Sequence, residues 1–258
     1  MFLRRDGDLR GHVVIQEGQV TLRGSEELAK GRIAQMELSA QRLQLAKSFS
    51  DELVKTCPWI RLAAISGSTA YATSRPDDDV DFFLVTTRNR LWITLLIAMI
   101  LARLRRLKSP ASPQFCFNRV SEDRECREEF RSVRDPLFAR EALNLRVLAG
   151  QDHYRDLLSV APWIGDIFPR LYSGLAAEDT AMETTEAVVT GRSRWWIANA
   201  IALIILAPYL MTVGPVRNHR LLRHGLELAQ FHTVLRRGFF AYESNKYEVL
   251  RERYSRVF

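Results

Sequence analysis

The chain has 258 residues, of which 47% are apolar and 26% charged, a composition that excludes a disordered protein and allows a sizeable core. Its net charge of +7 favours polyanionic partners such as nucleotides, nucleic acid or an anionic membrane surface, although an ordinary basic surface fits the same value. Three cysteines without a CxxC pair indicate neither a disulfide framework nor a zinc site, and they suit a reducing cytoplasm.

The N-terminal part is expected to hold a hairpin and helices. Its first residues, MFLRRDGDLRGHVV, contain no apolar h-region, so we expect no signal peptide. The segment GHVVIQEGQVTLRG alternates around a Glu-Gly turn, which is typical of a small β-hairpin. Helix formers then run from Ser25 to about Lys55, with a break expected near residues 48–50. Residues 1–55 are therefore predicted to precede the core.

The central part alternates strands with a helix. The runs IRLAAIS, VDFFLVTT and PQFCFNRVS predict three strands, and NRLWITLLIAMILARLRRLK predicts a helix between the second and the third. After about residue 124 the pattern predicts helices to the end. The expected fold is α+β, with a small mixed sheet flanked by helices over residues 56–125 and a helical C-terminal domain over residues 126–258.

One apolar stretch, WWIANAIALIILAPYLMTVGPV at residues 195–216, needs a separate interpretation. It contains no charged residue and is long enough to span a bilayer. Asn199 and Pro208 weaken that interpretation, and a buried helical hairpin broken near Pro208 or Gly214 explains the stretch as well. Both alternatives stay open at this point.

The stretch ISGSTAYATSRPDDDVDFFLV carries the residues with the clearest chemical meaning. A strand ending at Gly67 and Ser68 lets backbone N–H groups and a hydroxyl approach a phosphate, because glycine has no Cβ in the way. Ten residues separate Ser68 from Asp79, and the next strand begins with Asp79 and Asp81. Two residues apart on a strand, their carboxylates are predicted to share one face, roughly 7 Å apart.

Two carboxylates on one face of a strand suit Mg²⁺, which binds one or two carboxylates together with substrate phosphates and water. A pair of such ions activates an attacking hydroxyl and neutralises a leaving pyrophosphate. The structural alternative is that the acids of residues 77–79 cap a turn and Asp81 ends an edge strand. The upstream strand, the Gly-Ser turn and the apolar continuation together favour the metal site.

The same residues resemble the signature of the nucleotidyltransferases related to DNA polymerase β, in which Gly-Ser is followed by a loop of about ten residues and then by Asp-apolar-Asp-apolar. In this chain the signature is Ser66-Gly67-Ser68 and Asp79-Val80-Asp81-Phe82. The resemblance extends to a group of prokaryotic nucleotidyltransferase-domain proteins through NRLWITLLIAMI, FCFNRVS, AREALNLRVLAG, HYRDLLSVAPWIGDIFP and KYEVLRERY. It covers most of the chain from about residue 12.

The resemblance implies that Gly67 and Ser68 hold the phosphates of a nucleotide and that Asp79 and Asp81 bind Mg²⁺ or Mn²⁺. The family usually has a third carboxylate on a later strand of the sheet, and here that strand offers Cys116 and Asn118 instead. Asn118 can ligate a metal ion through its carbonyl but cannot accept a proton.

Three outcomes of this departure from the family pattern stay open. The first is that Glu122 or Asp123, just beyond the third strand, reaches into the site. In the second outcome, water deprotonates the substrate. The third outcome is that catalysis is weak or lost.

Two further cations are candidates for binding phosphate. Arg75 lies in the loop between the Gly-Ser turn and the acids, and Lys246 lies on an expected helix near the C-terminus. For Lys246 the sequence favours the alternative of a solvated helix end.

The sequence thus leads to the hypothesis of a Mg²⁺-dependent nucleotidyltransferase of the cytoplasm. It would move a nucleoside monophosphate from an NTP to an unidentified acceptor hydroxyl on an RNA end, a protein or a small molecule. The alternatives are a catalytically degenerate nucleotide-binding module and a membrane-associated protein with a helical hairpin at residues 195–216, peripheral or integral. Fold-level similarity does not choose the acceptor.

Overall fold

The computed structural model describes residues 11–16, 18–25, 27–110, 112–177, 195–223 and 231–245. Its helices are α2 (Glu27–Thr56), α3 (Gly67–Ala70), α4 (Leu91–Lys108), α5 (Asp123–Ser132), α6 (Pro136–Leu143), α7 (Gln151–Ser159), α8 (Trp163–Ile167), α9 (Pro169–Ala177) and α10 (Trp195–Arg223). Its strands are β1 (Val13–Gln16), β2 (Gln19–Leu22), β3 (Ile60–Ser66), β4 (Val80–Thr86), β5 (Phe115–Glu122), β6 (Arg146–Ala149), β7 (Phe231–Arg236) and β8 (Phe239–Ser244).

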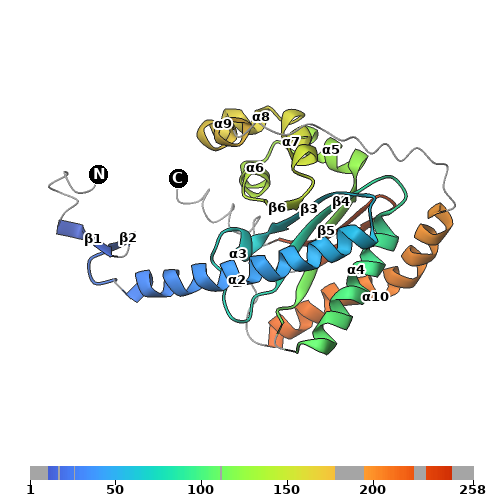
Figure 1. The fold of residues 1–258 in the computed structure, drawn as a ribbon, viewed down its shortest axis with the longest axis horizontal. Coiled ribbons are helices and arrows are strands. Elements are labelled where there is room, and N and C mark those ends of the chain that lie inside the picture. Colours follow the sequence, from blue (N-terminus) through green and yellow to red (C-terminus); the bar gives the residue numbers. More distant parts are fainter. Residues whose placement is uncertain are drawn as a thin grey trace.

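The body is a mixed six-stranded sheet with helices on both faces, which confirms an α+β fold (Figure 1). The strand order is β6-β3-β4-β5-β8-β7, and only β4 and β5 run parallel to each other. A parallel pair needs a long crossover, and α4 provides it. The hairpin of β1 and β2 forms a separate two-stranded sheet beside the N-terminal end of α2, as the alternation of its residues predicts.

Two apolar cores lie on opposite faces of the sheet. Side chains of β3 and β4 alternate between them, so that Phe82 and Leu84 face α2, α4 and α10, whereas Phe83 and Val85 face the helices α5 to α8. Burial on both faces explains why these strands are nearly continuous apolar runs. The acidic Asp81 interrupts this apolar run at the second residue of β4, near the N-terminal end of the strand.

The expected break near residues 48–50 is wrong. One helix, α2, runs without interruption from Glu27 to Thr56. Phe49, Ser50 and Leu53 are buried, and Phe49 packs against aromatic rings of β4 and β5. Packing of this face against the sheet outweighs the weak helix propensity of the serines.

The expectation that residues 126–258 form a helical domain is also wrong. Strands β6, β7 and β8 come from this part of the chain. In the sheet, β6 pairs beside β3 at one lateral edge, and β8 and β7 follow β5 at the other. The sheet therefore contains strands from both sides of the predicted boundary at residue 125, and the C-terminal part contributes both strands and helices.

The apolar stretch of residues 195–216 forms neither a broken nor a fully buried element. It belongs to the single helix α10, which continues through Pro208 and Pro215. Ala202, Leu206 and Leu210 are buried on one face of this helix, so packing holds the helix on both sides of Pro208. The opposite face is exposed.

Candidate active site

The register of β3, β4 and β5 brings predicted site residues to the same end of these three strands. We call this end the Gly67 edge. Ser66 at the end of β3 pairs with Asp81 at the start of β4, because these two strands are antiparallel. Asp81 in turn pairs with Cys116 near the start of the parallel strand β5. The turn that follows β3, Asp81 of β4 and the first residues of β5 therefore lie side by side.

Gly67 is in direct contact with Asp81. Its φ is +65°, in the left-handed region, and a Cβ at this position would lie 2.4 Å from Asp81 Oδ2. The structure thus requires glycine here for two reasons, the backbone conformation and the approach of the carboxylate. Ser68 follows at the start of α3. Its carbonyl accepts hydrogen bonds from the backbone N–H of Thr73 at 2.8 Å and from the Thr73 hydroxyl at 3.2 Å.

Asn118 is the β5 side chain that faces Asp81. Its Nδ2 donates to Asp81 Oδ1 at 2.5 Å, while its Oδ1 accepts from the Cys116 thiol at 2.9 Å. The position therefore presents an amide N–H group to the carboxylate, and the amide oxygen that could ligate a metal ion faces Cys116. The role of Asn118 as a metal ligand stays a prediction.

Asp79 lies just before β4, at one end of a groove with a cavity volume of about 850 Å³. The backbone N–H of its neighbour Val80 donates to the carbonyl of Gln114 at 2.9 Å, which holds this end of β4 to the segment before β5. The groove runs between α4 and α10 over β5 and β8, and its lining includes Met99, Arg103, Arg106, Phe117, Tyr209 and Tyr242. Asp79 is thus accessible from an apolar groove with arginines at its rim.

The loop between the turn and the acids is fastened to α2. Arg42, a buried side chain, donates from Nη2 to the carbonyl of Pro76 at 2.9 Å. Arg32 donates to the carbonyls of Tyr71 and Ala72, and the Ser39 hydroxyl accepts from the backbone N–H of Ser74 at 3.0 Å. The long helix therefore fixes the position of the loop relative to the Gly67 turn.

The structure also describes two loop residues that were interpreted from the sequence, Asp78 and Arg75. The Asp78 carboxylate accepts a hydrogen bond from the backbone N–H of Arg75 at 2.9 Å, so Asp78 closes a turn, as the structural alternative held. The side chain of Arg75 is exposed and close in sequence to the site. Lys246 lies outside the described residues.

Neither Glu122 nor Asp123 reaches the end of β4 where Asp81 lies, which contradicts the first of the three open outcomes, a third carboxylate supplied by one of them. Glu122 pairs with Thr86, at the opposite end of β4 from Asp81. At about 3.3 Å per residue, the two positions are roughly 16 Å apart. Glu122 accepts from the backbone N–H of Asn89 at 2.7 Å, and Asp123 forms ion pairs with Arg127 and His153.

The buried Glu122 has an unusual acidity. The pKa of its carboxyl is raised to about 7, chiefly by burial and to a smaller extent by the nearby Glu125. The backbone N–H of Asn89 and the cations Arg88 and Arg237 lower it, without offsetting burial.

The acids at the Gly67 edge are few. Among the described residues, no group of three or more His, Cys, Asp or Glu side chains could hold a metal ion. Because Mg²⁺ is often held by one or two carboxylates and substrate phosphates, metal binding by Asp79 and Asp81 stays a prediction.

One residue beside the site was missed from the sequence. Arg146 on β6 pairs with Ile65 of β3, and its Nε donates to the carbonyl of Ala70 at 3.2 Å, at the end of α3. Its side chain is exposed and so is available to an anion next to the turn. The short β6 lies in a part of the chain that was expected to be helical.

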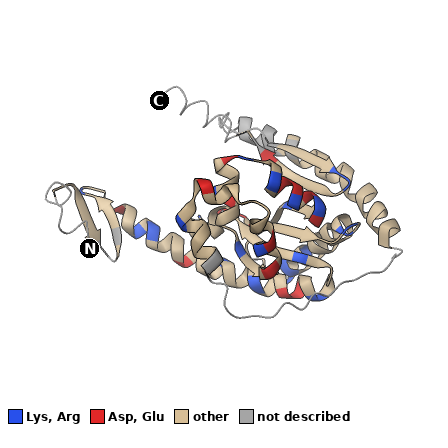
Figure 2. Cartoon of the chain, turned by 90° about the horizontal axis from the view of Figure 1, so that it is seen from above, with Lys and Arg blue, Asp and Glu red and all other residues tan. Residues whose placement is uncertain are grey.

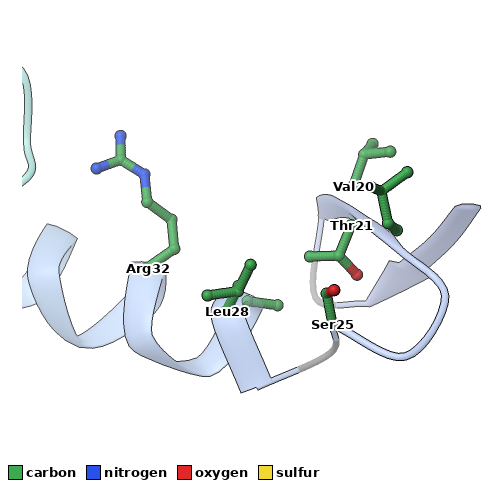
Figure 3. Close-up of a pocket in the computed structure, with 7 residues that line it drawn as sticks. Val20, Thr21, Ser25, Leu28 and Arg32 are labelled. Carbon is green, nitrogen blue, oxygen red and sulfur yellow. The ribbon is translucent and has the colours of Figure 1, made fainter.

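A second hollow of about 400 Å³ lies between the hairpin and the start of α2 (Figure 3). Its lining is Val20, Thr21, Leu22, Ser25, Leu28, Ala29 and Arg32, without an acid, a cysteine or a histidine. This set lacks the groups that acid-base or metal chemistry needs, so the Gly67 edge remains the candidate active site.

No family model, curated protein or solved structure matches the chain. The chemistry of the site has to be inferred from its own residues.

Replacement of Gly67 by alanine tests the contact between the turn and Asp81. We expect Gly67→Ala to lower the free energy of unfolding by about 2–4 kcal/mol, because the methyl group meets both an unfavourable φ and the carboxylate. Urea denaturation measures the change. The matched control is Gly174→Ala, since Gly174 lies on α9 with open space around it, and we expect its stability unchanged or raised by up to about 1 kcal/mol. Equal stability of the two variants would contradict the contact.

The raised pKa of Glu122 predicts a pH dependence of stability. The folded state holds the proton more tightly than the unfolded state, whose pKa is 4.5, so the free energy of unfolding falls as pH rises from 4.5 to about 7. Glu122→Gln removes this decrease, and we expect the variant to gain about 2–3 kcal/mol relative to wild type between about pH 4 and pH 8. Urea denaturation at both pH values measures it. Glu128→Gln, at an exposed position of α5, is the control, and an identical pH profile for wild type and Glu122→Gln would contradict the prediction.

Proposed function

We propose that the protein is a Mg²⁺- or Mn²⁺-dependent nucleotidyltransferase that moves a nucleoside monophosphate from an NTP to an acceptor hydroxyl. The observation that carries the proposal is the contact between the Gly67 turn and the Asp81 carboxylate. A phosphate that approaches the backbone of this turn would lie next to an acid able to share a metal ion with it. The fold, a mixed sheet with this edge open to solvent, is compatible with the nucleotidyltransferase sheet that the motif implies.

The proposed roles follow from the placement of each group. Gly67 and Ser68 bind the phosphates through the backbone, and Asp79 and Asp81 hold the metal ions. The exposed Arg75 and Arg146 offset the negative charge of the triphosphate. Lys246 keeps the phosphate-binding role predicted from the sequence.

The reaction itself is a substitution at the α-phosphorus. The acceptor oxygen forms a bond to this phosphorus, the bond from the phosphorus to the bridging oxygen of the β-phosphate breaks, and pyrophosphate leaves. Metal ions held by Asp79 and Asp81 would neutralise the charge of the leaving group. Because Asn118 cannot accept a proton and Glu122 lies at the other end of β4, the proton of the acceptor hydroxyl passes to water. Transfer is then expected to be slow compared with that of enzymes that have a third carboxylate.

The proposal does not specify which molecule carries the acceptor hydroxyl. An RNA end, a protein side chain and a small molecule all offer the required hydroxyl. The excess of cations in the chain is compatible with a polyanionic acceptor such as RNA, and a cytoplasmic location is expected for an enzyme that consumes NTP.

A second candidate function is nucleotide binding without transfer. The hydrogen bond from Asn118 Nδ2 to Asp81 Oδ1 favours it, because the amide occupies the position where a further metal-binding acid would face Asp81. Such a module would retain NTP and release it unchanged.

The double substitution Asp79→Asn and Asp81→Asn tests the proposal. We expect it to lower metal-dependent transfer by about 100-fold or more, because neutral amides cannot hold the metal ions that stabilise the transition state. The assay incubates purified protein with each α-³²P-labelled NTP, Mg²⁺ or Mn²⁺, and cellular RNA, protein or small-molecule fractions.

The matched control is Asp77→Asn, which removes an exposed negative charge of the same loop. Transfer by wild type and by the control, but not by the double variant, supports the proposal and names the acceptor class. Equal transfer by all three proteins would exclude the proposed roles. Retention of labelled NTP without any product would instead indicate the binding module.

A further inference from the structure

The exposed face of α10 is apolar to an extent that is unusual for a protein surface. Ile204 is 72% exposed, Met211 63% and Ile205 58%, and Ile197 and Ile201 lie on the same outward side. No charged residue occurs between Trp195 and Val216, and Figure 2 shows neither blue nor red over this stretch. Contiguous exposed apolar surfaces of this kind mark sites of interaction with proteins or membranes.

Within the described residues, Trp195–Val213 is long and apolar enough to cross a bilayer, and 22% of it is buried in the protein. Its inner face is tied to the body at two points. Asn199 Oδ1 accepts hydrogen bonds from the backbone N–H groups of Trp92 (2.8 Å) and Ile93 (3.3 Å) at the start of α4, and Thr233 of β7 donates to the carbonyl of Leu210 at 3.2 Å. A helix held in this way lies along the protein surface, and its outer face is available to the plane of a membrane.

The neighbouring helix α4 extends the apolar surface. Its C-terminal half runs beside α10, where the two helices line one groove (Figure 1). Ile100, Leu104 and Leu107 are exposed on α4, and they alternate with the cations Arg103, Arg105, Arg106 and Lys108. Apolar side chains interleaved with basic ones are typical of helices that bind the interface of an anionic bilayer.

The charges around α10 identify the partner. The sequence places Arg192 and Arg194 before the apolar stretch, Arg217, Arg220 and Arg223 after it, and no acid anywhere from residue 187 to residue 226. Among the described residues, α4 adds four cations and no acid beside this face, so a second copy of the chain would meet it with like charges. Anionic lipid headgroups complement these cations instead.

We propose that α10 docks the protein on an anionic lipid bilayer, lying in the plane of the interface with its outward isoleucines and Met211 among the acyl chains. Trp196, exposed at the start of the helix, lies where an aromatic ring prefers the headgroup region. The α4 cations contact the headgroups. The bilayer then covers the apolar face that the protein leaves exposed. This proposal does not depend on the proposed transfer reaction.

Vesicle flotation of the full-length protein tests this docking. The vesicles contain phosphatidylcholine alone or with phosphatidylglycerol, each at low and high salt. Ile201→Glu with Ile204→Glu puts two acids on the outward face and is expected to lower binding to the anionic vesicles by about tenfold or more. The control is Leu171→Glu, an equally exposed leucine on α9, which covers the opposite face of the sheet. Far-ultraviolet circular dichroism checks that all variants keep the wild-type fold.

The expected result is that wild type and Leu171→Glu float with anionic vesicles at low salt, that high salt weakens this binding, and that the double variant stays unbound. Extraction of bound wild type by alkaline carbonate would support the in-plane position, whereas resistance to it would overturn that position in favour of a spanning helix. Absence of binding to anionic vesicles would overturn the proposal. Light scattering measures the oligomeric state of each protein. If wild type does not bind vesicles but forms a dimer that the double variant disrupts, the partner is a second copy of the chain and the proposal is overturned.

Discussion

The pairing of Ser66 with Asp81 across β3 and β4 is the constraint on which the candidate active site depends. This register places the Asp81 carboxylate against the turn that follows β3. Only glycine, which has no side chain, leaves room for the carboxylate at position 67. A shift by one residue would turn Asp81 to the other face of the sheet, into the core that holds Phe82 and Leu84. The two cores therefore fix the register, and the register fixes the distance between turn and carboxylate.

The strands β3, β4 and β5 could be predicted because each is an apolar run bounded by polar or turn residues, and the Gly67 and Asp81 motif could be placed on them. The helical prediction after residue 124 failed because β6 is only four residues long and lies at a sheet edge, where burial leaves a weak pattern. For β7 and β8 a signal exists, since Arg237 and Gly238 form a two-residue turn between two runs that pair as a hairpin. The anchoring of the loop by Arg32 and Arg42 joins residues far apart in the sequence, which no local pattern encodes.

The two ends of β4 differ in their electrostatics. At its start the Asp81 carboxylate accepts a hydrogen bond from Asn118 Nδ2 and lies against the Gly67 turn. At its other end Thr86 pairs with the buried Glu122 of β5, and burial raises the pKa of the Glu122 carboxyl to about 7. The metal site proposed at Asp81 thus lies at the other end of the β4–β5 pair from the buried Glu122.

The metal ion at the Gly67 edge is the claim that one spectroscopic measurement tests most directly. Electron paramagnetic resonance of Mn²⁺ in the presence of a non-hydrolysable NTP analogue would report the ion, and its coupling to ³¹P would report phosphate in its coordination sphere. We expect wild type to bind Mn²⁺ with this coupling and Asp81→Asn to lose it. The same Mn²⁺ signal in both proteins, or no bound Mn²⁺ in wild type, would contradict a metal site formed by Asp81 and the Gly67 turn.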